Sequence, residues 1–92
     1  MNNYELVTIL SMKVSDEAKV AFAEKMKNLI SSKGELTNVD EWGKKVLAYE
    51  IKKEAEGFYI LFTFSSKPDA IIEIERQLKL DESVLKYMTV RI

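Results

Sequence analysis

Two apolar segments in the middle of the chain carry its clearest pattern. Residues 43–52 begin with a glycine and two lysines, and residues 58–64, which follow a short charged turn, are almost wholly apolar or aromatic. Together they predict a long β-hairpin. A strand like the second arm needs cover on both faces, and a chain this short has helices for only one of them. The pattern therefore predicts that another molecule covers the second face.

Two helices are predicted from their end signals. Ser15 can cap a helix whose first turn is acidic, and Gly34 is placed to end it. Pro68 can open a second helix, which residues 81–83 would end. Each helix has one apolar face. The apolar faces consist of Phe22, Met26, Leu29 and Ile30 in the first helix, and of Ile71, Ile74 and Leu78 in the second.

Four strands are predicted, at residues 4–10, at 36–42 continued through 45–52, at 58–64 and at 84–92. Gly43 interrupts the second strand, where it predicts a bulge or bend. Gly57 is expected to turn the chain into the third strand.

The order strand, helix, strand, strand, helix, strand predicts the split βαβ or ferredoxin-like plan, an α+β fold. Two helices then cover one face of a four-stranded antiparallel sheet, and residues 1–92 form one domain. Alternation along the strands divides the side chains between the two faces. The residues expected to face the helices are Tyr4, Leu6, Phe58, Ile60, Phe62 and Tyr87. The residues expected on the open face are Val7, Ile9, Tyr59, Leu61, Thr63, Lys86, Met88 and Val90.

Composition narrows the possible functions. The 92 residues are 47% hydrophobic and 32% charged, with a formal net charge of −1, so any nucleic-acid binding must come from a local basic patch. Cysteine and histidine are both absent, which excludes zinc fingers, thiol chemistry and Cys/His nucleophiles. No cofactor or metal is expected. No leader peptide and no apolar run of membrane-spanning length is found, which favours a cytoplasmic protein without a membrane partner.

The run G-K-K-V-L-A-Y-E-I-K at residues 43–52 resembles the signature of the bacterial ribosomal small-subunit protein six family. The resemblance extends over the whole chain, through the opening Tyr4-Glu5, Gly57-Phe58, Pro68-Asp69 and Met88. It implies a ferredoxin-like domain that is not an enzyme and has no small-molecule substrate. The family's role is to bind the central domain of 16S rRNA as a heterodimer with small-subunit protein eighteen, in the small subunit of cytoplasmic ribosomes.

The lysines at the bend can bind phosphates. If the last strand pairs with the first, basic and polar residues of both strands come together near the N-terminus and can form a second phosphate-binding patch. The expected RNA-binding residues are Asn2, Asn3, Tyr4, Lys44, Lys45, Lys86 and Arg91. Lys86 and Arg91 are five apart in one strand, so they should point to opposite faces. The alternative for the two lysines at the bend is a charged pair that protects a sheet edge.

The expected partner surface is the apolar part of the open face together with the first hairpin arm. Its residues are Val7, Ile9, Val46, Ala48, Tyr59, Leu61 and Met88. The alternatives are a homodimer through the same face, or a one-residue error in the phase of the strands, which would exchange this set with the core set. In this chain Val46 stands where the family usually has a polar or charged residue, and Asn2 and Asn3 stand where many relatives carry basic ones. The chain stops at Ile92, whereas many relatives continue into a tail.

Other interpretations remain open. Trp42, Tyr49 and Phe62 invite a base-stacking interpretation, but the signature of RNA-recognition sheets is absent and a place in the core is preferred. The acidic residues near the strand ends are expected in solvated turns rather than in a metal site. They are Asp40, Glu41, Glu54 and Glu56. A small acyl-phosphate hydrolase would need an arginine in the loop after the first strand, which has none. A ligand-sensing regulatory domain is the third possibility.

Overall fold

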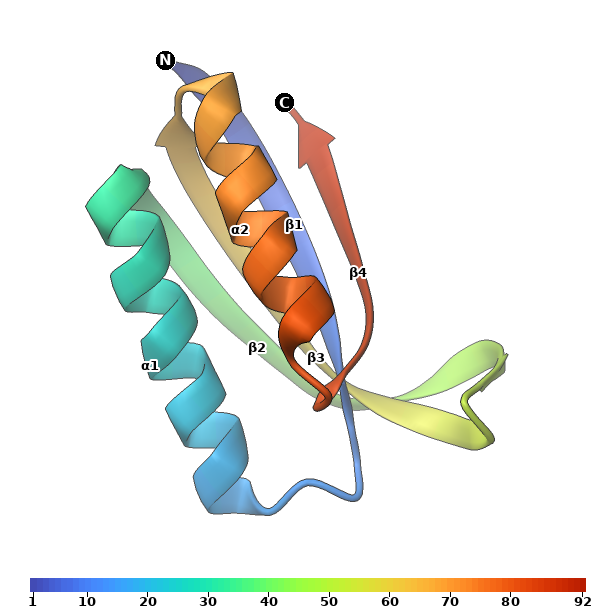
Figure 1. Cartoon of the computed structure of the whole chain (residues 1–92). Helices are drawn as coiled ribbons and strands as arrows, with labels where there is room; N and C mark the ends of the chain where they lie inside the picture. The colour runs from blue at the N-terminus through green and yellow to red at the C-terminus, as the bar shows by residue number, and fades with distance from the viewer.

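The computed structural model describes residues 1–92, and its elements alternate in the predicted order. These elements are β1 (Asn2–Ser11), α1 (Asp16–Lys33), β2 (Gly34–Ile51), β3 (Glu54–Ser66), α2 (Pro68–Leu80) and β4 (Val84–Arg91). Figure 1 shows both helices on the same face of the sheet and the two chain ends at the same end of the molecule. The hairpin of β2 and β3 projects away from both helices, toward the right of the view (Figure 1).

The sheet has the strand order β2-β3-β1-β4, and every neighbouring pair is antiparallel. Strand β1 therefore lies between β3 and β4. Each helix links two parallel strands with one strand inserted between them, which is the split βαβ plan. The predicted ferredoxin-like fold is confirmed.

The helix ends follow the predicted capping signals. The Ser15 side chain accepts a hydrogen bond of 3.1 Å from the backbone N–H of Ala18, which satisfies one free donor of the first turn of α1. Pro68 occupies the first turn of α2, where its missing N–H has no cost. Helix α2 ends at Leu80, and Asp81 follows as its C-cap.

The core lies between the sheet and the helices, and the predicted phase of the strands is confirmed. Leu6, Ile60 and Phe62 are fully buried against Met26 and other apolar residues of the helices. Tyr4 belongs to the same core, and Phe58 and Tyr87 pack against it while partly buried. Thr8, on the same side of β1, is also fully buried, and its hydroxyl donates to the Ile60 carbonyl at 3.0 Å.

The hairpin turns at a different place from the one predicted. The turn is formed by Lys52 and Lys53, with φ of 50° and 65°, and Ile51 pairs with Glu54 across it. Gly57 lies within β3, so the predicted turn at Gly57 is wrong. Glycine is required there for close approach, because a Cβ at this position would collide with the Ile9 side chain.

The predicted irregularity at Gly43 is confirmed. Its φ is 79°, in the region that favours glycine, and the pairing of β2 with β3 shifts between Glu41 and Gly43. Further shifts lie between Leu36 and Asn38 and between Val46 and Ile51, and the last of them takes the hairpin end of β2 out of a regular ladder.

Glu54 is not the solvated turn residue that was expected. Its carboxylate accepts the Ser11 hydroxyl, with distances of 2.9 and 2.8 Å to the two oxygens, and the Met12 backbone N–H at 3.1 Å. The Ser11 hydroxyl oxygen accepts in turn from the Lys13 backbone N–H at 3.1 Å. Glu54 therefore fastens the start of β3 to the turn between β1 and α1.

Candidate functional site

The face of the sheet that the helices leave uncovered carries an apolar row across three strands. Leu61 of β3 pairs with Val7 of β1, which pairs with Met88 of β4. In the next row Tyr59 lies opposite Ile9, and Ile9 lies opposite Lys86. Side chains directly opposite on one face are in contact range. Five of the seven predicted partner-binding residues are therefore brought together on one surface, which we call the open face.

The open face is hollowed in two places. One hollow of about 180 Å³ is lined by Val7, Ile9, Tyr59, Lys86, Tyr87 and Met88. A second of about 110 Å³ is lined by Ile9, Leu47, Ala48, Tyr49, Ile51, Tyr59 and Lys86. Ala48 thus joins the predicted surface. Val46 does not, because it lies opposite Glu56 with 76% of its surface exposed and lines neither hollow.

Leu47 is a residue of this surface that the sequence analysis did not identify. It forms a small buried cluster with Ile9 and Leu85, against which Ile51 and Tyr59 pack. The cluster explains why Ile9, on the open face, is only 8% exposed. In the sequence, Leu47 lies in the apolar run Val46-Leu47-Ala48. The face of the sheet to which its side chain points depends on the register shifts of the hairpin, so the run alone did not assign it.

Three of the predicted RNA-binding lysines lie toward the hairpin end. The Lys44 Nζ is 3.6 Å from a carboxylate oxygen of Glu56, in an exposed pair. The Lys45 Nζ is 5.5 Å from the centre of the Trp42 ring. The Lys86 Nζ donates a hydrogen bond of 3.2 Å to the Tyr49 hydroxyl and lies 5.7 Å from the centre of that ring. Lys45 and Lys86 are therefore held by aromatic partners and keep their charge free of any carboxylate.

The remaining predicted RNA-binding residues lie at the other end of the sheet. Arg91 pairs with Tyr4, and its Nη2 donates to the Asn2 side-chain oxygen at 3.1 Å. The Asn2 amide nitrogen donates to the Tyr4 hydroxyl at 3.3 Å. The Tyr4 ring itself is buried beside Phe64. Asn3 accepts a hydrogen bond from the Ser65 hydroxyl on the other face of β1.

One expected patch is not formed. Lys86 pairs with Ile9 and not with the first residues of β1, so it does not lie beside Asn2 and Arg91. Ile9 is five positions further along β1 than Tyr4, which is a distance of about 17 Å. The expectation that Lys86 and Arg91 point to opposite faces is confirmed, since their partners Ile9 and Tyr4 do so. The predicted residues form two groups at opposite ends of the sheet.

Two aromatic residues expected in the core are exposed. Trp42 is 44% exposed and stacks on Tyr59, with ring centres 6.2 Å apart. Tyr49 is 64% exposed. Phe62, the third of the set, is in the core as expected. The prediction was wrong for Trp42 because its ring lies on the open face. Asp40, two residues earlier in β2 and paired with Leu61, lies on the same face and accepts a hydrogen bond of 2.9 Å from the Trp42 Nε1.

The titratable groups give no indication of acid–base chemistry on the open face. The pKa of Glu73 is lowered by hydrogen bonds from Arg76 and Gln77, and the pKa of Arg76 is raised by the same pair. Both groups are exposed on α2. No cluster of His, Cys, Asp or Glu suited to a metal is found, and no helix is long and apolar enough to cross a membrane. The surface is suited to binding through apolar contact and positive charge.

The order of the elements and the strand order define a small α+β protein of ferredoxin-like architecture, with one apolar face of its sheet uncovered. Solved structures support the fold. The crystal structure of 30S ribosomal protein S6 from Thermotoga maritima matches with a TM-score of 0.95 and 27% identity, covering 99% of this chain and 87% of that one. The C-terminal domain of the MgtC protein from Mycobacterium tuberculosis shares the fold alone, with a TM-score of 0.59 and 11% identity.

Sequence relatives identify the family. The family model described as Ribosomal protein S6 matches residues 3–91. Small ribosomal subunit protein bS6 of Alkaliphilus metalliredigens is 46% identical over 92 residues, which are 100% of this chain and 98% of that protein. The same protein of Caldanaerobacter subterraneus is 44% identical over 92 residues, covering 99% of this chain and 97% of the relative. The chain belongs to the ribosomal protein S6 family of the small ribosomal subunit.

Proposed function

We propose that this chain binds the central domain of 16S rRNA as a heterodimer with small-subunit protein eighteen. Its role is then structural, in the assembly of the small ribosomal subunit. The observation that carries the proposal is the apolar row of Leu61, Val7 and Met88 on the open face of a chain that belongs to the ribosomal protein S6 family. Met88 is 53% exposed, and exposed apolar rows of this kind favour association with another protein.

In this proposal the open face binds the protein partner, and basic and polar residues at the two ends of the sheet bind the RNA. The open face holds the partner through apolar contact, centred on Val7, Tyr59 and Met88 beside the 180 Å³ hollow. Phosphate contacts come from the lysines at the hairpin end and from Asn2 and Arg91 at the other end. Because the net charge of the whole chain is −1, its RNA affinity depends on these local groups and on the partner.

The first test is a titration of the chain against the rRNA central domain, with and without the partner, at two salt concentrations. The expected result is tight binding only in the presence of the partner, with an affinity that falls as salt rises. Binding that is independent of both partner and salt would contradict the proposal.

A matched pair of variants tests the surface itself. Met88→Asp places a charge at the β4 end of the apolar row on the open face, and Ile72→Asp makes the same change on α2, where Ile72 is 73% exposed. We expect Met88→Asp to weaken partner binding by more than about tenfold, since a buried unpaired charge is strongly unfavourable, and Ile72→Asp to leave it unchanged. Equal effects of the two variants would show that the open face is not the partner interface.

A further inference from the structure

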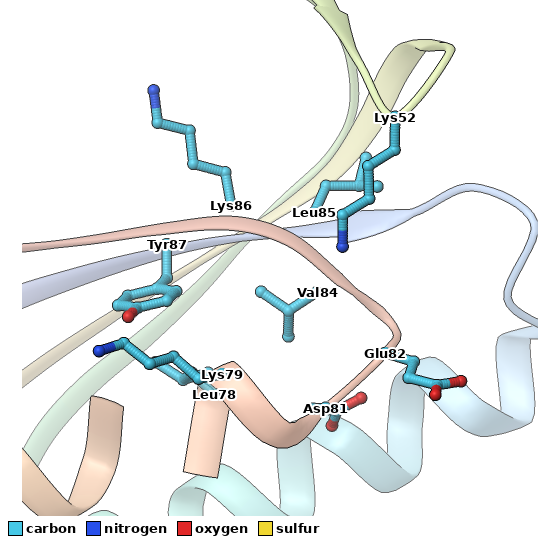
Figure 2. Close-up of a pocket in the computed structure, with 9 residues that line it drawn as sticks. All are labelled: Lys52, Leu78, Lys79, Asp81, Glu82, Val84, Leu85, Lys86 and Tyr87. Atoms are coloured by element: carbon cyan, nitrogen blue, oxygen red, sulfur yellow. The ribbon is translucent and has the colours of Figure 1, made fainter. Parts of the chain in front are cut away.

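The largest pocket of the protein lies beside the open face, with whose hollows it shares the lining residues Lys86 and Tyr87. Its volume is about 420 Å³, and it lies where the hairpin turn, the end of α2 and the start of β4 meet (Figure 2). Its lining residues are Lys52, Leu78, Lys79, Asp81, Glu82, Val84, Leu85, Lys86 and Tyr87. Three separate elements therefore contribute a lysine to one pocket.

Two of these lysines have no anionic partner. The ion pairs of the protein involve Lys19, Lys25, Lys27, Lys44 and Arg76, and neither Lys52 nor Lys79 takes part. The Tyr87 hydroxyl makes no hydrogen bond within the protein. Figure 2 shows the Lys79 amine beside the Tyr87 hydroxyl and the Lys52 amine entering from the hairpin side. Three free donors thus border the pocket.

The two acidic residues of the lining do not neutralise these donors. The Asp81 carboxylate is occupied, because it accepts the Ser83 backbone N–H at 2.9 Å and lies 3.9 Å from the Lys25 Nζ. The Glu82 carboxylate is turned away from Tyr87 and Lys79 in Figure 2. Lys86 directs its amine away from the pocket, toward Tyr49.

The backbone at Lys52 gives a second, independent indication. Lys52 and Lys53 both have positive φ, a conformation that favours asparagine or glycine in a two-residue hairpin turn. A lysine at such a position is costly for the fold, and strain of this kind is often found where a side chain has a function. Here the strained turn directs a positive charge over the pocket (Figure 2).

We propose that Lys52, Lys79 and Tyr87 form a pocket that binds the phosphate backbone of the RNA, with Lys79 and Tyr87 on one phosphate and Lys52 on a second. An ammonium group grips a phosphate as a point charge, and a hydroxyl adds one hydrogen bond. The inference rests on the proposed function for its ligand and adds a third place of RNA contact, whose three residues were not among the predicted RNA-binding residues. A free phosphate would use the same chemistry, so the experiment must separate the two sources.

The main test compares the double variant Lys52→Ala, Lys79→Ala with the double variant Lys27→Ala, Lys33→Ala, which removes the same charge from α1. Each is titrated with the rRNA central domain in the presence of the partner, over a range of salt. Losing two phosphate contacts should lower the slope of log affinity against log salt by about 1.5 and weaken binding roughly three- to tenfold. The α1 variant should match the wild type. Equal behaviour of the two variants overturns the proposal.

If the wild type does not bind the central domain, the proposed function is contradicted, and the pocket is tested by a second measurement. NMR spectra of the free protein are then followed during titration with a short single-stranded RNA and, separately, with inorganic phosphate at the same ionic strength. Selective shifts at Lys52, Lys79 and Tyr87 with RNA support the pocket. Shifts with phosphate alone, or no selective shifts, overturn it.

Discussion

The carboxylate of Glu54 is expected to contribute more to stability than any other charged group of the hairpin. It accepts hydrogen bonds from the Ser11 hydroxyl and the Met12 backbone N–H, and Ser11 is only 7% exposed. In Glu54→Ala both donors lose their acceptor, and one of them is buried. A hydrogen bond to a charged group contributes about 1.5–3 kcal/mol, and leaving a buried donor unpaired costs about 1–3 kcal/mol.

The two effects overlap, so Glu54→Ala should lower the free energy of unfolding by about 2–3 kcal/mol. For a domain of 60–100 residues, a change of 1 kcal/mol shifts the melting temperature by about 4–8 °C. The expected fall is therefore on the order of 10 °C. Glu54→Gln keeps one neutral acceptor and should lose roughly half as much.

The assay is thermal unfolding followed by circular dichroism, together with urea denaturation to obtain the free energy. Glu56→Ala is the matched control, because Glu56 is two residues away and its only partner is the exposed Lys44. An exposed ion pair contributes at most about 1 kcal/mol. If Glu54→Ala and Glu56→Ala unfold within about 2 °C of each other, the inference that Glu54 fastens the hairpin to the β1–α1 turn is refuted.

Three further predictions concern the hairpin and the core. Gly57→Ala should destabilise the protein by about 1–3 kcal/mol in urea denaturation, because the added methyl collides with Ile9; an unchanged midpoint would show that β3 can move away. Lys53→Gly should stabilise the protein by about 0.5–1 kcal/mol, because glycine adopts a positive φ without steric cost. Lys53→Ala removes the same charge and should not stabilise it. Equal urea midpoints for the two variants would contradict strain at Lys53. Phe62→Ala should cost about 3–5 kcal/mol, since the ring is fully buried, and a loss below about 1 kcal/mol would be inconsistent with its place in the core.

The fold was predictable because its signals were local and mutually consistent. Ser15 and Pro68 marked the helix starts, and the alternation in β1 and β3 assigned Leu6, Ile60 and Phe62 to the core face. With one face covered by helices, a shift of one residue would have moved every apolar side chain of a strand to the wrong side. The order of the elements then left the split βαβ plan as the natural arrangement.

The hairpin end was not predictable in the same way. Its turn consists of Lys52 and Lys53, whereas asparagine or glycine normally signals a two-residue turn. The turn was therefore predicted at Gly57, the nearest glycine. The register shifts in β2 change which side chains face the sheet, and periodicity cannot locate such shifts. This is why Leu47 was not predicted to belong to the open face.

The candidate site was predicted in part for the same reasons. The apolar open face followed from the period of the strands, and Val7, Leu61 and Met88 lie together there. The position of Lys86 relative to the N-terminus depended on the pairing register of β1 with β4, which no local signal specifies. Likewise, the pocket of Lys52 and Lys79 joins elements that are distant in the sequence.

The central position of β1 has a consequence for the speed and order of folding. Strand β1 pairs with β3 and with β4, and Tyr4 meets Arg91 from almost the other end of the chain. Only β2 and β3 pair through a short turn. Closing long loops slows folding, so the chain should fold at the rate of mixed α/β domains, with the hairpin able to form first and β4 able to join late. Substitutions in β4 should then mainly accelerate unfolding and leave the folding rate nearly unchanged, which stopped-flow measurements can show.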